Sequence, residues 1–162
     1  MFFKRRKLVK NDIKFSAKLL FKDVSPEKWD QDYLTKENLD FSIDSVRLVN
    51  EYADRLIHTT YGQQLLKEHP DNFTMRIGAY LGEVIKNHVD GKYRWFDFQS
   101  IKLQTNHLND YSMSVQDEAV LYSQKLDKVI CPIYEVKQYL NGKSEYKKFL
   151  TYVEEAIKKG CV

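Results

Sequence analysis

The chain has 162 residues, of which 43% are hydrophobic and 14% aromatic, and its 26 basic and 23 acidic residues leave a net charge of +3. This composition excludes a disordered polymer and indicates one folded domain with its own core. The small net charge does not by itself imply nucleic acid, the two cysteines lack metal-ligand spacing, and no apolar run is long enough to span a membrane. We therefore expect a cytoplasmic protein without disulfides, metal or other cofactor.

A basic arm is predicted over residues 1–10, followed by a single domain over residues 11–162. The arm holds the only dense run of charge, formed by Lys4, Arg5, Arg6, Lys7 and Lys10. A solvated terminus is the first expectation for such a run. Contact of residues 2–10 with an anionic membrane or a nucleic acid is the alternative. No apolar segment follows that would make the arm a secretory signal.

Helical patterns dominate the first half of the chain. Residues 12–22 fit either a strand, by alternation, or one face of a helix, and this choice stays open. Ser25 precedes a proline and is typical of a helix start. A clearer helix follows, in which Ser42 is expected to be the N-cap while Phe41 and Val46 form a hydrophobic staple.

Two glycines four residues apart mark the best-defined helix. Gly78 and Gly82 lie in a helical apolar pattern that Asp71 is expected to cap and Asp90–Gly91 to end, and a short helix over residues 61–69 precedes it. A glycine inside a helix costs about 1 kcal/mol relative to alanine. We expect a partner backbone lying close against this face to offset that cost, which makes the helix the packing centre of the domain.

The second half is predicted to hold a small antiparallel sheet and then two helices. The predicted elements are a strand over residues 93–98, a loop over 99–115, strands over 118–124 and 128–131 joined at Leu126–Asp127, a helix from Pro132 to Asn141–Gly142, and a helix from Ser144 to Gly160. Alternation in the first strand places Tyr93 and Trp95 on one face and Arg94 and Phe96 on the other. Because helices and strands are segregated, the fold class is α+β, with N-terminal helices and two C-terminal helices around the sheet.

The candidate site centres on the carboxylate of Glu83, one turn from the glycine face. It is expected to pair with Arg76 or Arg94, and Tyr80 and Trp95 complete the set of candidate ligand- or partner-binding residues. The structural alternatives are an ion pair or a solvated helix face for Glu83, and core packing for Trp95. A stacking platform for nucleic acid is the weaker functional reading of the aromatic strand.

Histidine and cysteine patterns give no catalytic or metal motif. The four histidines are scattered, without a His-Glu-x-x-His or i, i+4 pair, so neither a metal site nor a catalytic residue is assigned. Cys131 is expected to be a buried small hydrophobe, and nothing in the spacing supports a Cys–His nucleophile.

Three stretches carry a resemblance to a known class of domains. At Leu39-Asp40-Phe41-Ser42, at Gly78-Ala79-Tyr80-Leu81-Gly82-Glu83-Val84-Ile85 and at Trp95, the chain resembles small uncharacterised bacterial domains that have an "LD-S" helix start, a "G-Y-LGE-I" helix and a downstream tryptophan. The resemblance extends over about residues 39–157. It implies a stand-alone cytoplasmic product without an assigned activity, and some proteins of this kind act as immunity or accessory partners for toxins.

The leading hypothesis is a non-enzymatic module that binds another protein, as an immunity or regulatory partner. Its basis is the abundance of tyrosine, with 11 in the chain, and the lack of a catalytic motif. A small-ligand or enzyme site near Glu83 is the second hypothesis, and contact through residues 2–10 is the third. The sequence does not indicate the oligomeric state.

Overall fold

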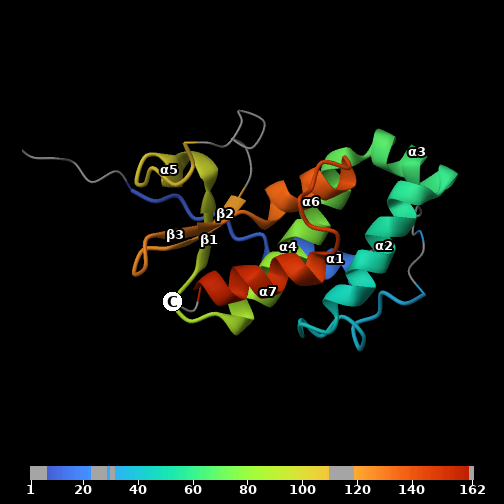
Figure 1. Ribbon diagram of the computed structural model, residues 1–162, viewed down its shortest axis with the longest axis horizontal. Coiled ribbons are helices and arrows are strands. Elements are labelled where there is room, and N and C mark those ends of the chain that lie inside the picture. The colour runs from blue at the N-terminus through green and yellow to red at the C-terminus, as the bar shows by residue number, and fades with distance from the viewer. Residues whose placement is uncertain (1–6, 23–28, 30–31, 110–118, 161–162) are drawn as a thin grey trace, which may run out of the picture.

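The computed structural model describes residues 7–22, 29, 32–109 and 119–160, and within them it has the α+β architecture that the sequence predicts (Figure 1). In chain order the elements are α1 (Lys14–Lys22), α2 (Val46–His58), α3 (Thr60–Glu68), α4 (Pro70–His88), β1 (Arg94–Asp97), α5 (Phe98–Lys102), β2 (Ala119–Ser123), β3 (Lys128–Ile130), α6 (Pro132–Leu140) and α7 (Phe149–Gly160). The helix start predicted at Ser25 lies outside the described residues.

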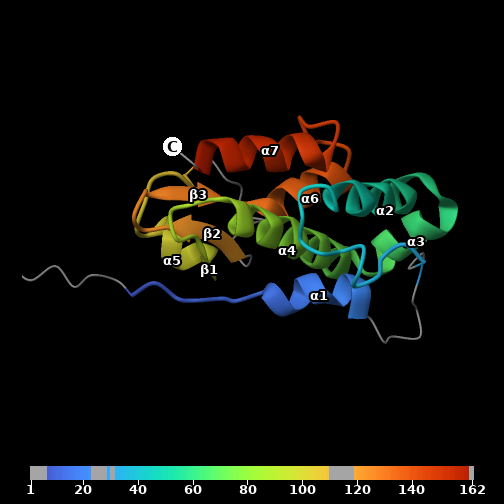
Figure 2. The same cartoon turned by 90° about the horizontal axis from the view of Figure 1, so that it is seen from below.

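Helix α4 is the centre of the fold. Figure 2 shows it between α1 on one side and α6 and α7 on the other. From Ile77 to Ile85 every residue of α4 is buried, as is expected of a helix with neighbours on all sides. A Cβ added at Gly78 would lie 2.7 Å from the Ile133 Cα in α6, and one added at Gly82 would lie 2.3 Å from the ring of Trp95. The predicted close approach is confirmed, by a backbone at the first glycine and by an indole at the second.

The three strands form an antiparallel sheet in the order β1-β2-β3, with Arg94 opposite Tyr122 and Leu121 opposite Ile130. The chain before α1 extends this sheet beside β1. Lys10 bridges to Phe96, and the Asp97 N–H donates to the Val9 carbonyl at 2.8 Å. Part of the predicted arm is therefore held against the sheet.

The two faces of β1 enter two separate cores, as the alternation predicts. Tyr93 and Trp95 join the main core, which α4 dominates. Phe96 joins a smaller cluster on the other face, together with Phe98 and Tyr122. The sheet thus has a buried hydrophobic cluster on each of its two faces.

The structure decides three expectations about helices α1 to α4. Residues 14–22 form a helix, because this segment lies along α4 and buries Ala17 and Leu20. The predicted cap at Ser42 is wrong, since α2 begins at Val46 and the Ser42 hydroxyl accepts from the Ser45 N–H in a preceding turn. The predicted cap at Asp71 is also wrong: α4 begins one residue earlier, at a proline whose missing N–H costs nothing in the first turn.

The second half follows the prediction with two corrections. The turn between β2 and β3 and the glycine end of α6 are confirmed, with Asp127 at φ 49° and Gly142 at φ 71°. The strand predicted over residues 93–98 extends one residue too far, because Phe98 begins helix α5. This helix also occupies the start of the segment predicted to be a loop over residues 99–115. Ser144 does not cap α7, which begins at Phe149; the Phe149 N–H instead donates to the Asn50 Oδ1 of α2 at 2.6 Å.

Candidate functional site

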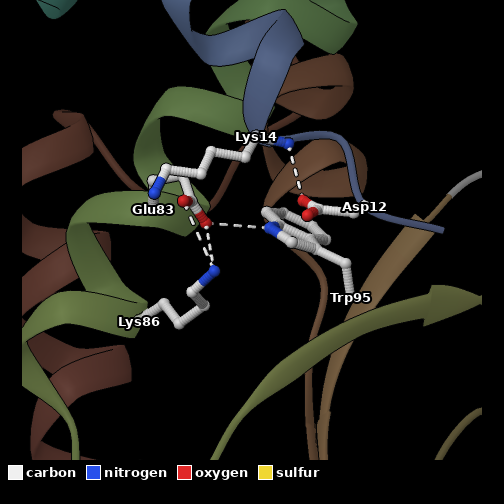
Figure 3. Close-up of polar contacts among 5 residues, drawn as sticks. All are labelled: Asp12, Lys14, Glu83, Lys86 and Trp95. Atoms are coloured by element: carbon white, nitrogen blue, oxygen red, sulfur yellow. Dashed lines mark hydrogen bonds and ion pairs between the residues drawn. The ribbon is translucent and has the colours of Figure 1, made fainter. Parts of the chain in front are cut away.

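The carboxylate predicted to be functional is buried between α4 and β1 (Figure 3). Glu83 is 1% exposed, and its Oε2 accepts a hydrogen bond of 2.9 Å from the Trp95 Nε1. The Lys86 ammonium lies 3.0 Å from the same oxygen and 3.4 Å from Oε1. A buried carboxylate needs such partners, because an uncompensated charge in the interior is strongly unfavourable.

The other predicted site residues do not gather at this carboxylate. Arg94 is exposed and, being next to Trp95 in a strand, lies on the opposite face of β1. Tyr80 is buried elsewhere along α4, where its hydroxyl accepts from the Phe41 N–H and shares a 2.7 Å hydrogen bond with Ser45. Arg76 is half-buried on α4. The expected pairing of Glu83 with an arginine is replaced by pairing with Lys86, three residues along the same helix.

The Glu83–Trp95 contact links the central helix to the sheet. The same indole fills the space above Gly82, so one side chain of β1 both packs on α4 and satisfies its buried acid. Both carboxylate oxygens have partners, which is the arrangement of a structural ion pair. The role of these residues in binding a ligand stays a prediction.

A groove of about 540 Å³ lies between β3 and α7. We call it the tyrosine groove; it is lined by Tyr93, His107, Asp127, Lys128, Val129, Ile130, Cys131, Tyr146, Tyr152, Glu155, Ala156, Lys159 and Gly160. Burial and a hydrogen bond to Glu155 raise the pKa of Tyr146 to about 12. This phenol is therefore neutral at physiological pH and available as a hydrogen-bonding surface.

Cysteine, histidine and aspartate side chains all line the tyrosine groove. The His107 Nε2 lies 3.4 Å from the Asp127 Oδ2, and this histidine is 55% exposed. Cys131 follows Asp127 by four residues along the chain. It is 6% exposed and packs in the smaller core. A thiol buried in an apolar core is usually a packing residue, which agrees with the buried small hydrophobe that the sequence predicts at Cys131.

A second concavity, of about 630 Å³, lies beside β1 and the residues that precede α1. We call it the basic hollow; it is lined by Lys7, Leu8, Lys10, Lys92, Arg94, Phe96, Gln104, Tyr122, Gln124 and Lys125. Five of these residues are cationic and none is acidic. The hollow and the tyrosine groove share no lining residue.

Sequence reasoning found only parts of the basic hollow. Arg94 was singled out as a partner for Glu83, and Lys7 and Lys10 as members of the arm. The signal that unites them is strand alternation: Lys10, Arg94 and Tyr122 belong to three paired segments and share one face. Recognising it requires knowing that residue 10 pairs with residue 96, which the sequence alone does not show.

No protein-family model, curated protein or solved structure matches this chain. Within the described parts of the chain, no helix is both long and apolar enough to cross a bilayer. The same residues contain no group of three or more histidine, cysteine, aspartate or glutamate side chains placed to hold a metal ion.

Proposed function

We propose that the protein is a non-enzymatic module that binds another protein, and that an extended segment of this partner adds to β3 in the tyrosine groove. The observation that supports this proposal is the edge of the sheet at β3, which is unpaired within the described part of the chain. Lys128–Ile130 pairs with β2 on one side, and no strand among the described residues pairs with it on the other. The backbone at this edge therefore borders the groove, where a partner strand would complete the ladder.

The lining of the groove suits a peptide. Three tyrosines, Tyr93, Tyr146 and Tyr152, come together there, and tyrosine is enriched at protein interfaces because its ring gives apolar area and its hydroxyl a hydrogen bond. Val129 and Ala156 add apolar surface between them. Backbone pairing would supply affinity, while the tyrosine-lined space would select the side chains of the partner.

The proposed biological role of the protein is to act as an immunity or regulatory partner of the bound protein. The resemblance of the glycine-bearing helix to small bacterial domains supports an immunity or regulatory partner, which would act by occupying a surface of its target. Such a role requires a durable complex and no chemistry at the interface.

Site-specific photo-crosslinking tests the proposal in the source cell. A photoreactive phenylalanine analogue at Tyr152 should capture one protein species, while the same analogue at Tyr61, a half-exposed tyrosine on α3, serves as the matched control. Capture at the first position alone, lost on Tyr146→Ala with an unchanged melting temperature, supports the groove as the interface. Equal capture at both positions, or capture insensitive to Tyr146→Ala, contradicts it.

A further inference from the structure

We infer that the basic hollow is a binding site for a compact anion carrying two or more phosphate groups. This inference is independent of the proposed protein interface, since the two surfaces have no residue in common. It rests on the charge of the hollow, on the way the fold positions that charge, and on the size of the cavity.

The lining of the hollow is far more basic than the chain as a whole. The whole sequence is nearly balanced, with 26 basic and 23 acidic residues, yet the charged residues lining the hollow are Lys7, Lys10, Lys92, Arg94 and Lys125. Within the described residues, none of these five side chains makes an ion pair. Five like charges around one cavity repel one another, and a bound anion would remove that repulsion.

The fold holds these cations on a rigid floor. Phe96 and Tyr122 form it and are 5% and 6% exposed, so their rings are fixed by the smaller core. Burial and the hydrogen bond to Asp127 raise the pKa of Tyr122 to about 12, so this phenol itself carries no negative charge at neutral pH. Arg94 is the cross-strand partner of Tyr122, which places its guanidinium at this floor.

The backbone around Lys92 is also unusual. This lysine has φ 57°, in the left-handed region that glycine and asparagine occupy more readily. The preceding Gly91 has φ 117°, and its carbonyl accepts a hydrogen bond from the Ser123 hydroxyl of β2. The turn is thus tied to the sheet in the conformation that brings Lys92 to the hollow.

Size and shape favour a small ligand over a polymer. A volume of about 630 Å³ falls within the range of small-molecule sites, roughly 300–1,000 Å³. Binding of single-stranded nucleic acid relies on exposed rings for base stacking, whereas Phe96 and Tyr122 are buried. A phosphate group carries up to about two negative charges, so two or three of them match five cations. Gln104 and Gln124 add amide groups that can bond to phosphate oxygens.

The same chemistry occurs in soluble polyphosphates and nucleotides and in phosphorylated lipid headgroups. The test therefore begins with calorimetric titration of the full chain at low salt, using inorganic tripolyphosphate, orthophosphate and poly-glutamate. Tripolyphosphate should bind at least about tenfold more tightly than the other two, with affinity that falls as salt rises. Vesicles with and without a bisphosphorylated inositol lipid then distinguish the sources: tripolyphosphate should displace the protein from them if the lipid uses the hollow.

Two double variants, each of which removes two positive charges, locate the binding site. Arg94→Gln with Lys125→Gln should weaken tripolyphosphate binding by at least about tenfold, because each lost contact to a charged ligand costs about that much. Lys147→Gln with Lys148→Gln makes the same change in net charge on exposed residues before α7 and should leave the affinity within about twofold. A melting curve shows that each variant is folded.

Three results would overturn the inference. The first is an absence of tripolyphosphate binding at low salt, and the second is an equal loss of affinity in both double variants. The third is binding of an oligonucleotide that tightens with length, competes with tripolyphosphate and is lost in the variant with Arg94→Gln and Lys125→Gln, which would assign the hollow to a nucleic acid.

Discussion

Replacing Gly82 by alanine separates the two forces that act on the central helix. Helix propensity alone predicts that the alanine stabilises the protein by about 1 kcal/mol. The structure predicts the opposite, because the new Cβ would lie 2.3 Å from the Cη2 and Cζ2 atoms of Trp95. Ordinary contact between carbons is about 3.5–4.0 Å, so the indole would have to retreat by more than about 1 Å.

The expected loss in the free energy of unfolding follows from the contacts that this movement of the indole breaks. Overpacking a core costs about 1–3 kcal/mol. The 2.9 Å hydrogen bond from Trp95 to the Glu83 carboxylate is lost as the ring moves, and a hydrogen bond to a charged group is worth about 1.5–3 kcal/mol. With about 1 kcal/mol returned by propensity, Gly82→Ala should lower the free energy of unfolding by about 1.5–5 kcal/mol.

Urea unfolding followed by circular dichroism measures this difference, and Trp95→Phe provides the matched background. Phenylalanine lacks the indole atoms that the Cβ would meet, so Gly82→Ala should be neutral or stabilising by up to about 1 kcal/mol in that background. An equal cost of the alanine in both backgrounds would refute the packing argument. So would a single Gly82→Ala variant more stable than the wild type.

Three further outcomes test other contacts. Asn50→Ala should lower the free energy of unfolding by at least about 1–2 kcal/mol in the same urea titration, because it removes the acceptor for the Phe149 N–H at the start of α7. Asn50→Asp keeps that acceptor but loses the amide donor to Tyr139 and Asp54 and adds a second carboxylate beside Asp54, so it should not restore the stability. Burial and a neighbouring carboxylate raise the pKa of Tyr139 to about 12, so this tyrosine ionises at lower pH in the unfolded chain than in the folded protein. Its contribution to the free energy of unfolding should be fully present below pH 10 and fall as pH rises from 10 toward 12. Tyr139→Phe should remove part of this fall in thermal melts. At low salt, Arg94→Gln with Lys125→Gln should raise the melting temperature by about 1–4 °C, an increase that high salt should abolish if repulsion in the hollow is its cause.

Local chemistry made much of the fold predictable. The paired glycines of α4 identified the most tightly packed helix, and Asp127 and Gly142 occupy the positive-φ positions that end their elements. The N-caps of the helices were less predictable, because a serine hydroxyl accepts a hydrogen bond from a backbone N–H in a short turn as well as at the start of a helix. Ser144 illustrates this: its hydroxyl accepts from the Tyr146 N–H, while the helix that follows is capped by a residue 99 positions away.

The site was less predictable than the fold, since its geometry depends on pairing over long range. The glycine face drew attention to Glu83, but the sequence left open whether its carboxylate is paired or solvated. The structure buries it and pairs it with Lys86, which lies three residues further along the same helix. Arg94 lies on the other side of the sheet. The basic hollow needed three segments to be paired in the correct register before its cations lay together.

The attachment of the first described residues to β1 has a consequence for the dynamics of the molecule. This attachment consists of the bridge between Lys10 and Phe96, which is formed by two backbone hydrogen bonds that join Val9 and Asn11 to β1, and a side-chain bond from Asn11 to Asp97. A short edge of this kind opens at far lower free energy than the helices behind it. Detachment would carry Lys7 and Lys10 away from the remaining three cations while α4 stays packed. Faster deuterium uptake at the Asp97 amide, slowed by an anion bound across both halves, would show the hollow assembling and separating within a folded protein.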